Sequence, residues 1–157
     1  MPRRLSVTVD RFPLAAQFTI ARGSKTEAAV VTCRLTSDEA SGWGECVPYA
    51  RYGESVDGVR EAIEGIAEDL ADEGFDREAL GRRLPAGAAR NAVDCALWDL
   101  EAKRSNRSVA SLAGLAPPAA LVTAYTISLG TTDAMAEATR AAAHRPVLKI
   151  KVGAPEG

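Results

Sequence analysis

The N-terminal part of the chain alternates between apolar and polar residues with a period of two, the pattern of half-buried strands. Three segments show this pattern: LSVTVDRF from Leu5, AAVVTCRLT from Ala28 and the shorter SGWGECV from Ser41. In the second segment Val31, Cys33 and Leu35 share one face. A short polar turn, SDEASG, separates the last two segments, so we predict an antiparallel meander of three strands.

The period then changes to three and four, which predicts helices. Ser55 is a suitable N-cap for one helix on which apolar residues recur from Val56 to Leu70. A second helix is expected after Asp76. A third runs from about Ala88 to Lys103, and its predicted buried side comprises Ala92, Cys95, Ala96 and Leu100.

The best linker in the chain is Ala116-Pro117-Pro118, since neither proline can donate a backbone hydrogen bond. Beyond it lie an apolar segment (LVTAYTISL), a helix from about Asp133 capped by Thr132, and a second apolar segment (PVLKIKVG). A strand, helix and strand in this order predict a parallel pair joined by a right-handed crossover.

These elements predict an α+β domain over residues 1–116, an antiparallel three-stranded sheet with helices, followed by one βαβ unit over residues 119–157. A single βαβ unit leaves strand edges open and one face of its sheet uncovered. We therefore expect the chain to be truncated.

Composition excludes several classes of function. The formal net charge is −2, with acidic and basic residues interleaved, so no basic surface is expected to bind nucleic acid or an anionic membrane. The three cysteines lack CxxC spacing and there is a single histidine, which argues against a zinc site and for reduced, mostly buried thiols. No signal peptide or membrane-spanning stretch is evident, and we expect a cytoplasmic protein.

The segment Val147–Val152 carries the chemistry that the rest of the chain lacks. Its alternation places Leu148, Ile150 and Val152 on one face, with Lys149 and Lys151 together on the other. Neighbouring like charges favour the neutral amine, the form that can accept a proton from carbon. Alternating lysines are equally typical of a solvent-facing strand, and the pattern alone leaves both interpretations open.

Longer strings resolve this choice. KIKVG after a βα unit resembles the Lys-X-Lys signature on the second barrel strand of the muconate-lactonizing subgroup of the enolase superfamily. The strings PLAAQFTIARGSKTEA, GWGECVPYARYGES, LPAGAARNAVDCALWDLEAK and TAYTISL resemble the dipeptide epimerases in particular, and the resemblance covers roughly residues 4 to 153.

The resemblance implies a capping domain over a modified TIM barrel and Mg²⁺ bound by carboxylates on barrel strands that lie beyond residue 157. Lys151 matches the acid/base lysine on one face of the substrate α-carbon, and Lys149 matches the supporting lysine near the substrate carboxylate. Thr126 matches a substrate-contacting threonine at the end of the first barrel strand. The lysine of the opposite face is expected on a later strand, so we assign no metal ligand here and expect this chain alone to be inactive.

Two loops of the capping domain are candidates for substrate specificity. In Ile20–Lys25, Arg22 matches a position that reaches the distal carboxylate of an acidic dipeptide, a task that suits a guanidinium fork. In Pro48–Glu54, Tyr52 belongs to a short aromatic segment that we predict to act as a lid over the substrate. A charged turn and a simply packed-down loop are the alternative interpretations.

The function implied is Mg²⁺-dependent epimerisation, a 1,1-proton transfer, at the α-carbon of a dipeptide such as L-Ala-D/L-Glu. The small-molecule dipeptide is the expected partner, and the sequence leaves a homo-oligomer open. The alternatives are another enzyme of the subgroup, such as an N-succinylamino-acid racemase or o-succinylbenzoate synthase, and a non-catalytic fragment.

Overall fold

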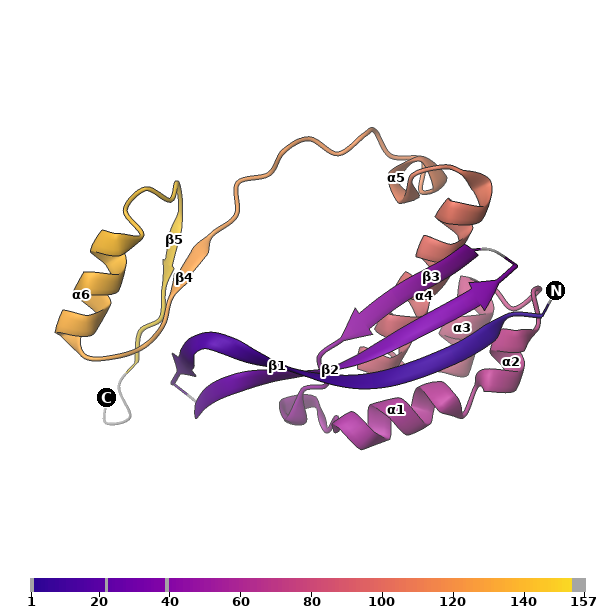
Figure 1. Ribbon diagram of the computed structural model, residues 1–157, viewed down its shortest axis with the longest axis horizontal. Helices are drawn as coiled ribbons and strands as arrows, with labels where there is room; N and C mark the ends of the chain where they lie inside the picture. The colour runs from indigo at the N-terminus through magenta and orange to yellow at the C-terminus, as the bar shows by residue number, and fades with distance from the viewer. Residues whose placement is uncertain (1, 22, 39, 154–157) are drawn as a thin grey trace. The chain divides into compact units, whose positions relative to one another are not determined.

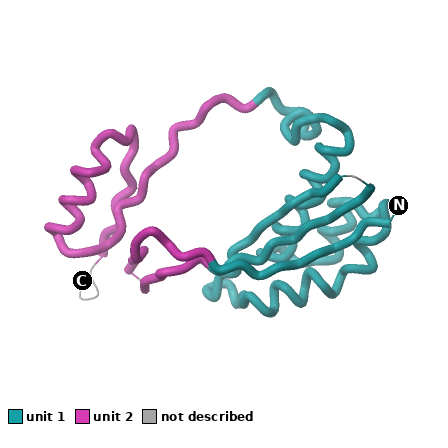
Figure 2. Tube along the Cα trace, in the orientation of Figure 1, with its two compact units in different colours: residues 1–11, 29–117 teal, residues 12–28, 118–157 magenta. Residues whose placement is uncertain are grey.

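The computed structural model describes residues 2–21, 23–38 and 40–153. Contacts divide the chain into two compact units, each built from two segments (Figure 2). The first comprises Met1–Arg11 and Ala29–Pro117, and the second comprises Phe12–Ala28 and Pro118–Gly157. Within the described residues no helix has the length and apolar character needed to cross a bilayer.

A three-stranded sheet forms one layer of the first unit (Figure 1). Its order is β1 (Arg4–Ile20), β2 (Gly23–Ser37) and β3 (Ala40–Cys46), and β2 and β3 pair antiparallel with Cys33 opposite Gly44. The predicted meander is confirmed. Its first two strands are longer than predicted and form a hairpin whose far part, residues 12–28, belongs to the second unit.

Helices cover one face of this sheet (Figure 1). The Ser55 hydroxyl caps its helix as predicted, accepting a hydrogen bond from Gly58 N–H (3.1 Å). The helix predicted after Asp76 is also present, and the Asp76 carboxylate caps it by accepting from Ala79 N–H (2.8 Å). The elements are a short 3-10 helix η1 (Ala50–Tyr52), α1 (Val56–Glu64), α2 (Ala67–Ala71), α3 (Arg77–Arg83), α4 (Ala88–Ser105) and α5 (Val109–Leu112).

The prediction of one continuous helix from Ser55 to Leu70 is wrong, because the chain divides into α1 and α2 at Gly65 and Ile66. Glycine has a low helix propensity, and Ile66 leaves the helical region at φ −114° and ψ 18°. The break still lets Ile63, Ile66 and Leu70 all reach the core, where each is at most 2% exposed.

Helix α4 packs directly on β3, and two glycines allow its close approach. A Cβ atom on Gly42 would lie 2.1 Å from the Ala96 carbonyl oxygen, and one on Gly44 would lie 1.9 Å from that of Ala92. The buried face of α4 comprises Ala92, Val93, Ala96, Leu97, Leu100 and Ala102. Cys95 was predicted on this face and is instead exposed, because the buried stripe runs through its neighbours at Ala92 and Ala96.

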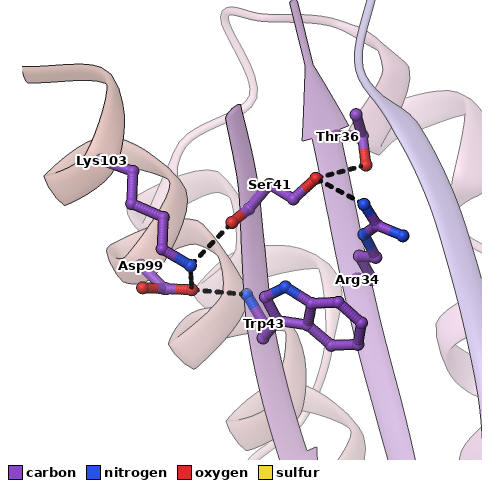
Figure 3. A network of polar contacts seen from close by, with 6 residues as sticks. All are labelled: Arg34, Thr36, Ser41, Trp43, Asp99 and Lys103. Atoms are coloured by element: carbon purple, nitrogen blue, oxygen red, sulfur yellow. Dashed lines mark hydrogen bonds and ion pairs between the residues drawn. The ribbon is translucent and has the colours of Figure 1, made fainter. Parts of the chain in front are cut away.

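Side chains of α4 also form hydrogen bonds with backbone groups on the unpaired edge of β3, the end strand of the sheet (Figure 3). The Asp99 carboxylate accepts a hydrogen bond from Trp43 N–H (2.8 Å) and pairs with Lys103 Nζ (2.6 Å). Lys103 Nζ in turn donates to the Ser41 carbonyl (2.9 Å). An edge strand exposes unpaired backbone groups, so these bonds fix α4 in register with β3.

The second unit contains the predicted parallel pair, β4 (Tyr125–Ile127) and β5 (Leu148–Ile150), joined through α6 (Thr132–Ala141). Both strands are shorter than the apolar segments that predicted them, and Leu121 and Val122 are exposed. The cap of α6 is Thr131, whose hydroxyl accepts from Ala134 N–H (3.3 Å), rather than the predicted Thr132, which is the first helical residue.

Candidate active site

The parallel pair brings the predicted lysines and threonine together. Thr126 on β4 lies directly opposite Lys149 on β5. The pairing continues past the end of β5, because Lys151 N–H donates to the Ile127 carbonyl (3.1 Å). Since residues two apart share a face of a strand, Thr126, Lys149 and Lys151 all lie on one face of the pair.

The opposite face of the pair is apolar and meets α6. Ile127 is 1% exposed, Leu148 is half-buried and Ala142, just past α6, is 5% exposed. The side chains of Lys149 and Lys151 therefore project from the face that α6 does not cover, with Lys149 exposed and Lys151 partly buried. The alternation of the two faces is as the period of two predicted, but on the apolar face Ile150 is 50% and Val152 79% exposed.

The far part of the β1–β2 hairpin reaches the carboxyl end of β4 within the same unit. The Ser128 hydroxyl accepts a hydrogen bond from Thr19 N–H (2.7 Å) and lies 3.2 Å from the Thr19 carbonyl. Leu129 N–H donates to that carbonyl as well (3.0 Å). Arg22, between Ala21 and Gly23, lies outside the described residues, so its predicted role is not tested.

The loop that carries Tyr52 belongs to the first unit and is held by a carboxylate. Glu54 accepts hydrogen bonds from Tyr49 N–H (2.9 Å) and from Ala88 N–H (2.6 Å), the first residue of α4. These two backbone donors hold the pKa of Glu54 below its usual value. Gly87, the N-cap of α4, has no side chain for this task, so Glu54 caps the helix from another part of the chain.

Tyr52 itself is 76% exposed and is not packed into the core. Its ring lies 5.6 Å from that of Tyr49 at an interplanar angle of 48°. A hollow of about 420 Å³ lies beside the loop, and Tyr49, Tyr52, Glu54 and Asn91 contribute to its wall. An exposed aromatic beside a hollow can contact a ligand, which leaves the lid interpretation of this loop standing as a prediction.

Sequence reasoning placed Ser128 on the inward face with Thr126 but did not find its partner, and it did not single out Glu54. Ser128 follows Thr126 with strand spacing, which puts it on the lysine face but does not identify Thr19 as its partner. Glu54 directly precedes the N-cap Ser55, where an acidic residue is common in any case. Thr19 and Ala88, the partners of Ser128 and Glu54, are far away in the chain, so no local signal reveals these contacts.

The described residues supply no metal centre: nowhere in 2–21, 23–38 and 40–153 do three His, Cys, Asp or Glu side chains gather as a metal site requires. Mg²⁺ prefers octahedral oxygen coordination, usually with one or more carboxylates. The lysine face of β4 and β5 presents ammonium groups and a hydroxyl, which do not fit that donor set.

Comparison with known proteins gives one family. The description "Mandelate racemase / muconate lactonizing enzyme, N-terminal domain" matches residues 3–114. The chain is 45% identical over 152 residues to the L-Ala-D/L-Glu epimerase of Escherichia coli (strain K12), covering 96% of this chain and 47% of that protein. It is 41% identical over 122 residues to an N-acetyl-D-glutamate racemase of a Pseudoalteromonas species, covering 75% and 38%.

Solved structures agree with this. An enolase family member from Agrobacterium tumefaciens with homology to dipeptide epimerases, solved with sodium and L-Ala-L-Glu bound, superposes with a TM-score of 0.91. It is 52% identical, and the match covers 97% of this chain and 46% of that one. The chain thus spans about half the length of the curated relatives and structures it matches. By its family match and this identity, the chain belongs to the mandelate racemase/muconate lactonizing enzyme family of the enolase superfamily.

Proposed function

We propose that this chain supplies the capping domain and the first barrel strands of a dipeptide epimerase that moves a proton at the α-carbon of L-Ala-D/L-Glu or a close analogue. The observation that carries the proposal is the shared face of Thr126, Lys149 and Lys151 on β4 and β5. Residues 1–116 form the cap in this proposal, and residues 119–157 begin the barrel. A cytoplasmic location is proposed with it.

Lys151 is the proposed acid/base. As a neutral amine it takes the α-proton from one face of the substrate, leaving the electron pair of the C–H bond on the enolate. Reprotonation on the other face inverts the centre and requires a second acid, which we assign to the part of the relatives that this chain does not span. Lys149 and Thr126 orient the substrate, and Lys149 does so by binding the substrate carboxylate.

Mg²⁺ is proposed as the cofactor of the complete protein, where it would stabilise negative charge on the substrate carboxylate. Solved relatives from Cytophaga hutchinsonii and Enterococcus faecalis hold Mg together with a dipeptide. The described residues of this chain provide no site for it, so we assign its ligands to the remainder of the protein.

The substrate class follows from what two relatives share. L-Ala-D/L-Glu and N-acetyl-D-glutamate, named for the relatives at 45% and 41% identity, are both glutamates acylated at nitrogen. We propose Arg22 as the group that binds the distal carboxylate of this glutamate, and Tyr52 as a contact from the lid loop. Arg22→Ala should then raise the KM for Ala-Glu about tenfold or more, and that for an uncharged dipeptide much less.

The test uses the complete protein, this chain continued by the second half present in its relatives. Lys151→Met should abolish epimerisation in both directions and solvent deuterium exchange at the α-carbon of one epimer, while exchange of the other epimer persists. Lys151→Arg is the matched control, because arginine keeps the charge but cannot act as a base. Positioned proton transfer contributes about 10²–10⁴-fold, so the loss is measurable by NMR. Undiminished exchange of both epimers in Lys151→Met would exclude Lys151 as the base.

A further inference from the structure

A single hydroxyl connects two segments that are far apart in the chain. Ser128 Oγ accepts from Thr19 N–H (2.7 Å) and lies within hydrogen-bond distance of the Thr19 carbonyl (3.2 Å). The two residues are 109 positions apart. Because a hydroxyl can donate and accept at once, it engages both backbone groups of one residue, much as a neighbouring strand would.

Two further contacts place the hairpin tip beside the proposed catalytic face. Leu129 N–H donates to the Thr19 carbonyl (3.0 Å), which extends the contact along the carboxyl end of β4. Ala21 lies against Gly153, two residues after Lys151, since a Cβ on Gly153 would be 3.4 Å from that of Ala21. The tip therefore contacts the segments that directly follow β4 and β5, close in the chain to Thr126, within β4, and to Lys151, the first residue after β5.

The part of β1 that leads to Thr19 is exposed to solvent. Residues 11–18 are all exposed, and Phe12, Leu14 and Phe18 are between 36% and 52% exposed. A hydrogen bond between the Thr19 and Ser24 hydroxyls (2.9 Å) lies within the hairpin and does not connect it to β4. Thr19 becomes partly buried where it meets Ser128.

We propose that Ser128 is a positioning residue that holds the tip of the β1–β2 hairpin at the carboxyl end of β4, and thereby sets the affinity of the site for its dipeptide. Ser128 acts through Thr19 and takes no part in proton transfer. This inference rests on the proposed epimerase function, because it assumes that substrate lies at the Thr126 and Lys151 end of the strands.

The test compares Ser128→Ala with Ser128→Thr, which keeps the hydroxyl, in the complete protein. Loss of one neutral hydrogen bond changes an equilibrium constant roughly 2- to 12-fold. Ser128→Ala should raise the KM for L-Ala-L-Glu within that range and leave kcat within about twofold of the parent, and it should speed hydrogen exchange at the Thr19 amide. Ser128→Thr should restore both. Thr8→Ala, which removes an exposed β1 hydroxyl bonded to Asp10, is the matched control and should change neither.

The two measurements separate failure of this inference from failure of the function. A parent protein without epimerase activity would overturn the proposed function, and Thr19 exchange would still decide whether Ser128 holds the tip. Unchanged KM and unchanged Thr19 exchange in Ser128→Ala would overturn the positioning role. A loss of kcat at constant KM would also overturn it, since that would give Ser128 a part in the chemistry.

Discussion

Gly44→Ala tests the packing of α4 on β3 directly. A Cβ at this position would lie 1.9 Å from the Ala92 carbonyl oxygen and 2.8 Å from the Ala96 nitrogen, whereas ordinary contact begins at 3.4 Å. Both neighbours are helix backbone, which cannot move aside as a flexible side chain could. The methyl group can be admitted only if α4 retreats from the sheet by more than about 1 Å, against the close packing of the interior.

The cost is large because the retreat affects the whole core. Overpacking alone typically destabilises by about 1–3 kcal/mol. A displaced α4 would also loosen Leu97 and Leu100, and the Asp99 bond to Trp43. We therefore expect a loss near the top of that range, ~3 kcal/mol. For a unit of this size each kcal/mol moves Tm by roughly 4–8 °C.

Urea unfolding followed by far-UV circular dichroism and tryptophan fluorescence measures this loss. Gly81→Ala is the matched control, because it lies inside α3 with no atom within 4 Å of the added Cβ. Alanine is the better helix former, so the control should gain about 0.5–1 kcal/mol. If Gly44→Ala unfolds within about 0.5 kcal/mol of the parent, the contact between α4 and β3 does not depend on glycine and the packing argument is refuted.

Two further predictions concern titratable groups of the first unit. In the native protein Cys95, which is exposed, should react with Ellman's reagent, although partial burial raises its pKa. Cys33 and Cys46 should react only after unfolding, because both are buried and burial raises the pKa of Cys33 to about 12 and that of Cys46 to about 11. Fast reaction of all three thiols would contradict this. Glu54→Gln can accept from only one of two N–H groups and should cost ~1 kcal/mol at pH 7, as loss of a helix cap does. Since the folded pKa of Glu54 lies below 4.5, its contribution is present above that pH and is lost as pH falls through the folded pKa, so urea midpoints of parent and variant should converge in acid; a difference that persists there would be evidence against the cap.

The strands, the helices and the shared face of the two lysines could be predicted from the sequence alone. Periodicity located the strands and helices, and the cap Ser55 could be predicted because a capping side chain bonds to a backbone group within three residues of itself. Alternation likewise placed Lys149 and Lys151 on one face, since this depends only on the geometry of an extended chain. These are local properties, so they do not depend on how the elements pack together.

Contacts between residues far apart in the chain depend on how the elements pack. Opposition of Thr126 and Lys149 depends on strand register, and exposure of Cys95 depends on where the buried stripe of α4 meets β3. The partners of Glu54 and Ser128 include residues 34 and 109 positions away. The residue type shows that a side chain can accept a hydrogen bond. Which donor it meets depends on strand register and packing, and the local pattern of apolar and polar residues does not specify these.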